Sequence, residues 1–147
     1  MKKLFIFRRV IIGLMLGILF TGSLLPVAAE DYSCNCVLWV RSQTGLPGGP
    51  ATAAGYTERV MWNFGYKRVS PQGGTIMVWD AYRKGAGSSG HMAIVSNAYY
   101  DGGTRKWVIN VRHANWGGCG IRTTTFTGVS SVADWGNLDG VNFYARR

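Results

Sequence analysis

The chain has 147 residues, with 16 lysines and arginines against 7 aspartates and glutamates and a formal net charge of +9. This length predicts one domain with its own hydrophobic core, and the positive charge favours encounter with anionic surfaces without selecting one of them. The basic residues are scattered along the sequence, so the composition argues against a dedicated nucleic-acid-binding protein.

The N-terminus has the pattern of an export signal. A basic start, Lys2-Lys3 and Arg8-Arg9, precedes an apolar stretch at 10–25, and small residues follow at 27–29. We expect cleavage after Ala29, so that residues 1–29 form a signal peptide and residues 30–147 a secreted or periplasmic domain with a formal charge of +5. A retained transmembrane anchor is the alternative, but the apolar stretch is shorter than the roughly 20 residues of a spanning helix.

Two helical segments come next. Residues 36–44 place apolar side chains at helical spacing, and Gly45 and Pro47 then end the pattern. After Pro50, apolar side chains repeat every three or four residues over 53–64, and Gly65 supplies a stop. We therefore expect two helices at the beginning of the mature chain.

From residue 75 onward the pattern changes to strands. Residues typical of strands gather in five segments with glycine-rich turns between them: 75–79, 91–95, 106–116, 121–127 and 141–145. The threonine-rich segment 121–127 predicts an edge strand. Helices followed by a run of strands predict an α+β fold, with N-terminal helices packed on an antiparallel sheet.

Cys36 and His91 are the first candidate catalytic residues. Cys36 opens the first helical segment, where the helix dipole is expected to lower the thiol pKa and favour the thiolate. His91 follows the glycine-rich loop 85–90 and begins a strand, so its side chain can point into a cleft. Each residue also has a structural interpretation, as a half-cystine or as a packed histidine.

The segment 106–116 carries further polar residues. If it is a strand throughout, alternation places Val111, His113 and Asn115 on one face. A polar side chain on a core face needs a hydrogen-bonding partner, and either His113 or Asn115 is able to orient the ring of His91. The alternative is that both lie at a strand end in water. A cysteine, a histidine and a polar orienter suffice for thiol acyl transfer, with the backbone N–H of Cys36 as a donor to the oxyanion.

In order and approximate spacing, these segments resemble the CHAP family, the cysteine, histidine-dependent amidohydrolases and peptidases. The similar segments are NCVLWV at 35–40, GTIMVWD at 74–80, GHMAIV at 90–95 and HANW at 113–116. The resemblance covers nearly the whole mature chain and implies a papain-like α+β fold. It also implies that Cys36 is the nucleophile, His91 the base and Asn115 a polar orienter. Asn35 and Trp116 are then expected at the substrate groove.

The chain departs from the family pattern at one position. Many CHAP members carry glutamate two residues before the asparagine, where this sequence has His113. A glutamate holds the imidazolium through charge, whereas a neutral histidine holds it only through a hydrogen bond. Either His113 or Asn115 therefore remains a candidate to orient His91.

Three cysteines predict one disulfide and one free thiol in an oxidising compartment. If the similar segments converge on one site, Cys34 and Cys119 become neighbours, and we expect them to form the bridge that leaves Cys36 free. A Cys36–Cys119 bridge and three free thiols are the alternatives. No spacing in the sequence fits a four-ligand zinc site, so we expect neither metal nor cofactor.

The sequence thus predicts an exported, monomeric cysteine hydrolase that cleaves peptide or sugar–peptide amide bonds of peptidoglycan through an acyl-enzyme. Its expected partner is the peptidoglycan substrate and not nucleic acid, and it meets the membrane only through the signal segment. One alternative is a weak or inactive CHAP-fold domain that binds cell wall or a protein, as the loss of glutamate favours. The other is a thiol amidase of a non-wall amide.

Overall fold

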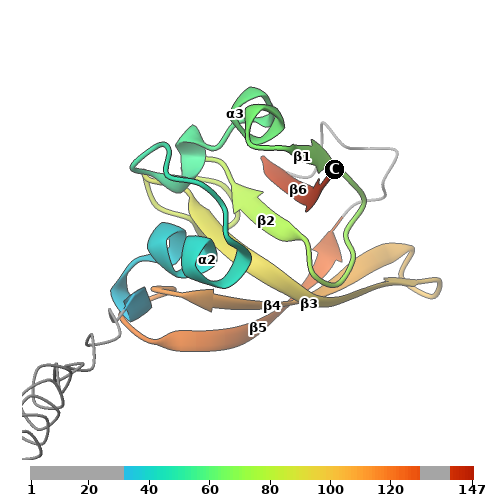
Figure 1. The fold of residues 1–147 in the computed structure, drawn as a ribbon. Helices are drawn as coiled ribbons and strands as arrows, with labels where there is room; N and C mark the ends of the chain where they lie inside the picture. Colours follow the sequence, from blue (N-terminus) through green and yellow to red (C-terminus); the bar gives the residue numbers. More distant parts are fainter. Residues whose placement is uncertain (1–31, 130–139) are drawn as a thin grey trace, which may run out of the picture. The chain divides into compact units, whose positions relative to one another are not determined.

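A computed structural model describes residues 32–129 and 140–147, so the predicted signal peptide at 1–29 lies outside the described residues. Within them, two α-helices precede six strands: α2 (Cys36–Thr44), α3 (Glu58–Asn63), β1 (Tyr66–Arg68), β2 (Ile76–Trp79), β3 (His91–Asp101), β4 (Lys106–Ala114), β5 (Ile121–Val129) and β6 (Val141–Arg146) (Figure 1). No helix in this described part of the chain is long and apolar enough to span a bilayer.

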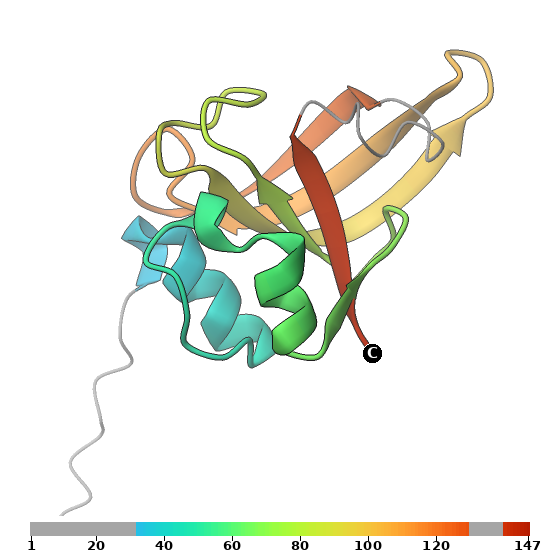
Figure 2. The same cartoon turned by 90° about the horizontal axis from the view of Figure 1, so that it is seen from above.

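The six strands form one sheet in the order β1-β6-β2-β3-β4-β5, and every neighbouring pair is antiparallel. Both helices lie on one side of this sheet, as the view from above shows (Figure 2). The predicted α+β fold, with N-terminal helices on an antiparallel sheet, is therefore confirmed. The prediction that the threonine-rich segment forms an edge strand is also confirmed, because β5 ends the sheet.

Local sequence signals define α2 at both ends. The side chain of Asn35 caps its N-terminus, because Oδ1 accepts the backbone N–H of Leu38 at 3.0 Å. At the other end Gly45 adopts the left-handed conformation, with φ of +67°, and its N–H donates to the carbonyl of Arg41. The helix occupies the predicted residues, and the cap places Cys36 at its first position.

The prediction of one continuous helix over residues 53–64 is wrong. The segment 53–64 divides into a 3-10 turn, Ala53–Gly55, and α3, because Tyr56 and Thr57 leave the helical conformation between them. The Tyr56 side chain is 1% exposed and lies in the core between the two pieces. Burial of this large aromatic ring outweighs the helical periodicity, which alone indicated one helix. The sequence pattern also missed β1, whose three residues are too few to show alternation.

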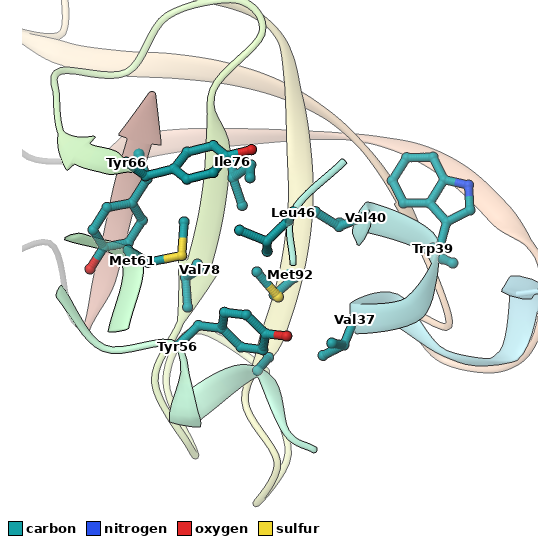
Figure 3. Close-up of a cluster of buried hydrophobic side chains, with 13 residues drawn as sticks. Val37, Trp39, Val40, Leu46, Tyr56, Met61, Tyr66, Ile76, Val78 and Met92 are labelled. Carbon is teal, nitrogen blue, oxygen red and sulfur yellow. The ribbon is translucent and has the colours of Figure 1, made fainter. Parts of the chain in front are cut away.

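Two cores lie on the two faces of the sheet. The first lies between the helices and the sheet, where Met61 of α3 and Val40 of α2 pack near Val78 and Met92 of the strands (Figure 3). The second core lies on the other face and contains Met77, Trp79, Ala93, Val95, Ile109, Val111, Val141 and Phe143. Residues on one face of a strand alternate, so His91 continues the row of Ala93 and Val95. His113 likewise continues the row of Ile109 and Val111, and both histidines lie at the end of the second core.

Candidate active site

Cys36 is the free cysteine of the three, and its side chain is partly buried at the start of α2. The other two form the disulfide Cys34–Cys119, with Cα atoms 4.2 Å apart. The predicted pairing is confirmed, and the alternatives of a Cys36–Cys119 bridge and of three free thiols are wrong. The first turn of α2 therefore presents one thiol that is available for chemistry.

The expected lowering of the thiol pKa is wrong in its net direction. Burial raises the pKa of Cys36 above its ordinary value, because the interior stabilises a thiolate less well than water does. Hydrogen bonds from the backbone of Met92, Val37 and Cys36 itself act in the opposite direction but do not outweigh burial. The resting residue is therefore a neutral thiol at neutral pH, with backbone N–H groups already placed to receive a thiolate.

His91 begins β3 directly after a turn that only glycine fits. Gly90 has a φ of +68°, and a Cβ on it would overlap the Trp79 carbonyl oxygen and the Ala54 backbone nitrogen. Across the sheet His91 pairs with Trp79, whose ring centroid lies 5.2 Å from the imidazole. The turn and the strand pairing together fix the His91 ring at the mouth of the second core, where it is 4% exposed.

His91 is hydrogen-bonded to the other histidine of the chain. Its Nε2 lies 3.0 Å from Nδ1 of His113, and Nε2 of His113 lies 2.9 Å from the hydroxyl oxygen of Thr124 on β5. Trp116 packs against both imidazoles, with its ring centroid 4.6 Å from that of His91 and 5.4 Å from that of His113. The two histidines are thereby held by a hydrogen bond to each other and by an aromatic neighbour, and Nδ1 of His91 takes no part in that bond.

Burial keeps both histidines neutral. Burial and, as the smaller cause, charge repulsion from the neighbouring His113 together lower the pKa of His91 to about 3. Burial also lowers the pKa of His113, which is 0% exposed, with a second contribution from the positive charge of Arg122. The paired rings therefore share one hydrogen bond as two neutral imidazoles, one donating and the other accepting.

Asn115 lies in the turn after β4 and takes no part in the His91–His113 hydrogen bond. The strand β4 ends at Ala114, so the expected alternation does not reach Asn115, which has a left-handed φ of +57° and is exposed. The prediction that Asn115 shares a face with His113 is therefore wrong. The residue in hydrogen-bond contact with His91 is His113, while Asn115 contributes to the wall of the adjoining pocket.

The loop after β4 is tied to the start of α2. The N–H of Asn115 donates to the carbonyl of Gly120, and the N–H of Gly120 donates to the carbonyl of Ser33. The Cys34–Cys119 disulfide joins the same two segments. The segment that precedes the Cys36-bearing helix and the loop that follows the His113-bearing strand are thus held together by a covalent bond and by a backbone hydrogen bond.

A pocket of about 540 Å³ brings most of the predicted site together. Its lining includes Cys36, His91, Asn115 and Trp116, and the loop between β2 and β3 forms another wall through Gly85, Ala86, Gly87, Ser89 and Gly90. Asn35, expected at the groove, is not among the lining residues, because its side chain caps α2. No acidic side chain among the described residues lines this pocket.

Sequence reasoning missed Thr124, although the strand pattern contains a signal for it. The segment IRTTTFT holds three consecutive threonines, and alternation puts Thr124 on the face of Phe126, away from Thr123 and Thr125. Phe126 packs against the second core and against Trp116. A threonine on that face, beside a buried histidine of the neighbouring strand, was a candidate hydrogen-bond partner.

No protein family, curated protein or solved structure matches this chain. Over residues 32–129 and 140–147, no three histidine, cysteine or acidic side chains gather into a group suited to holding a metal ion. Among the described residues, the pocket thus has a free thiol and an imidazole in its lining, and that imidazole is hydrogen-bonded to a second one.

Proposed function

We propose that the chain is an exported cysteine hydrolase that cleaves peptide or sugar–peptide amide bonds of peptidoglycan. One observation carries the proposal: Cys36 and His91 line the same pocket, and Nε2 of His91 is bound to His113. The order and spacing of the segments that resemble the CHAP family add to it. The Cys34–Cys119 disulfide supports an oxidising destination, in which Cys36 remains the reactive thiol.

The reaction follows from the groups at the pocket. Nδ1 of His91 takes the proton of the Cys36 thiol, and the sulfur attacks the amide carbonyl carbon. The backbone N–H of Cys36 donates to the oxyanion that forms. His91 then gives its proton to the leaving amine as the C–N bond breaks. Water, deprotonated by His91, attacks the resulting thioester, which releases the acid and restores the thiol.

The main energetic cost of this reaction is the first proton transfer, because Cys36 and His91 are both neutral at rest. Because burial raises the thiol pKa and lowers the imidazole pKa, transferring the proton from Cys36 to His91 is uphill. Two features lower that cost in the activated state. Backbone N–H groups, with Met92 first among them, bind the thiolate, and the hydrogen bond to His113 holds the charged ring of His91.

The charge distribution supports a polyanionic substrate. Residues 30–147 carry twelve lysines and arginines against seven acidic residues, a formal charge of +5. Peptidoglycan peptides carry free carboxylates, and a net positive charge favours their encounter with the protein. The glycine-rich wall at 85–90 leaves room for the substrate backbone to approach the thiol closely.

The test is digestion of purified peptidoglycan by the wild-type protein and by Cys36→Ala and His91→Ala, with the products read by mass spectrometry. Only the wild type is expected to release fragments, and their masses identify the bond that is cut. Thr127→Val, a change on an exposed part of β5, serves as a matched control with wild-type activity. Full activity in Cys36→Ala would rule the mechanism out.

A binding domain without strong activity is the second candidate, and the neutral thiol–imidazole pair favours it. If wild-type protein and Cys36→Ala both bind the polymer and neither releases fragments, this candidate replaces the hydrolase. If the wild type hydrolyses a simple peptide amide or thioester but not peptidoglycan, the protein is instead a thiol amidase of a non-wall substrate.

A further inference from the structure

The proposed mechanism makes a specific demand on His113. Once His91 has taken the proton of Cys36, both of its ring nitrogens carry hydrogen, so its Nε2–H must donate to His113. Nδ1 of His113 must then present a lone pair, because it is the atom 3.0 Å away. A neutral imidazole with a lone pair at Nδ1 carries its own hydrogen at Nε2. That hydrogen needs an acceptor inside the protein, since the His113 side chain is fully buried.

We propose that Thr124 is a positioning residue that supplies this acceptor and thereby sets the tautomer of both histidines. Its hydroxyl oxygen lies 2.9 Å from Nε2 of His113. With Thr124 accepting, His113 donates from Nε2 and accepts at Nδ1, and His91 donates from Nε2. Nδ1 of His91 is then the unprotonated nitrogen, as a base for Cys36 requires. The inference rests on the proposed function and specifies how its base is prepared without a carboxylate.

Two other described neighbours of His113, Arg122 and Trp116, cannot take this role. Arg122, opposite His113 in the β4–β5 register, is a donor only, and its positive charge disfavours a second proton on His113. The proton from Cys36 therefore stays on His91 and is not passed outward. Trp116 stacks on His113 with an interplanar angle of 28° and keeps the ring in the plane that reaches both partners. The Thr124 side chain is only partly buried, so its own hydrogen is able to reach solvent.

Nitrogen NMR of the imidazole rings tests the tautomers without requiring catalysis. The chain contains two histidines, so a histidine-labelled sample of the full chain gives four ring-nitrogen signals, which single-histidine variants assign. In the wild type at pH 7 we expect hydrogen on Nε2 of both rings. Thr124→Ser keeps the hydroxyl and is expected to keep this pattern. Thr124→Val removes the acceptor and is expected to move hydrogen in His113 toward Nδ1.

Kinetics give the second measurement. Loss of one buried hydrogen-bond partner predicts a fall in kcat of about tenfold to a hundredfold in Thr124→Val, with KM little changed because Thr124 does not line the pocket. Thr124→Ser is expected to restore kcat to within about threefold of the wild type, a smaller change than loss of a hydrogen bond. Thr123→Val is the matched control, since this exposed neighbour on β5 faces the opposite side of the sheet.

The two measurements separate the inference from the function on which it rests. A wild-type spectrum with hydrogen on Nδ1 of His113, or a Thr124→Val spectrum identical to the wild type, overturns the role of Thr124. That role is also overturned if the wild type hydrolyses its substrate and Thr124→Val does so equally well. If the spectra change as expected but the wild type has no hydrolytic activity, the hydrogen-bond chain stands and the proposed function fails.

Discussion

Acidification is expected to destabilise the fold through His91. The side chain is buried and its pKa is lowered to about 3, whereas an unfolded chain has a histidine pKa of 6.5. Between these values the unfolded chain binds a proton that the folded protein does not. The stability contributed by neutral His91 is thus fully present above pH 6.5 and is lost as the pH falls toward 3. At pH 4.5, two units below the unfolded value, the loss is about 2.7 kcal/mol.

Urea unfolding at pH 7.0 and at pH 4.5 measures this loss. The comparison is between a Cys36→Ala protein and the same protein with His91→Asn, so that titrating groups that do not contact His91 contribute equally to both. The protein with His91 is expected to lose about 2.7 kcal/mol more between the two pH values, a large part of a typical stability of roughly 5–15 kcal/mol. An equal loss in the two proteins would show that His91 is not held neutral by burial, and the account of the resting pair would be wrong.

Three further predictions concern the surroundings of the thiol and of His91. Because the Cys34–Cys119 bridge closes a separation of 85 residues, replacing both with serine is expected to lower the free energy of unfolding by about 2–5 kcal/mol in denaturant titration; an unchanged midpoint would contradict this. Gly90→Ala places a Cβ against Trp79 and Ala54 at a φ of +68°, so a loss of more than about 2 kcal/mol is expected by thermal unfolding. His113→Ala should lower kcat about tenfold or more beyond Asn115→Ala, because the hydrogen bond to His91 comes from His113; the reverse order would return the orienting role to Asn115.

The parts of the fold that were predictable depend on local signals. The cap at Asn35 and the left-handed Gly45 lie within the segment they delimit, so the sequence shows where α2 begins and ends. The break between Ala53–Gly55 and α3 was not predictable in this way. It arises because Tyr56 is buried by residues of α2 and of the sheet, which are distant in the sequence. Periodicity shows which residues share one face of a helix. It does not show whether packing against residues distant in the sequence interrupts that helix.

The candidate site also divides into features that local sequence signals show and features that depend on packing by distant residues. Cys36 and His91 were identifiable because each begins an element that its flanking residues define. Asn115 was misplaced because alternation was extended past Ala114, where the chain turns to meet the disulfide. The pKa of Cys36 was expected to fall because a helix N-terminus is visible in the sequence. The burial that reverses the shift comes from packing, and packing is not visible there.

If the chain works as proposed, His113 stands where many CHAP members carry a carboxylate, and this has a chemical consequence for the whole site. A carboxylate stabilises an imidazolium by its charge at some distance, so its hydrogen bonds need not all be aligned. A neutral histidine offers one lone pair, and it offers that lone pair toward His91 only when its other nitrogen carries hydrogen. In the proposed mechanism orientation therefore replaces charge as the means of activating His91, and the acceptor beyond His113 becomes as important as His113 itself. In the proposed hydrogen-bond chain that acceptor is the hydroxyl of Thr124, 2.9 Å from Nε2 of His113 and on the edge strand of the sheet.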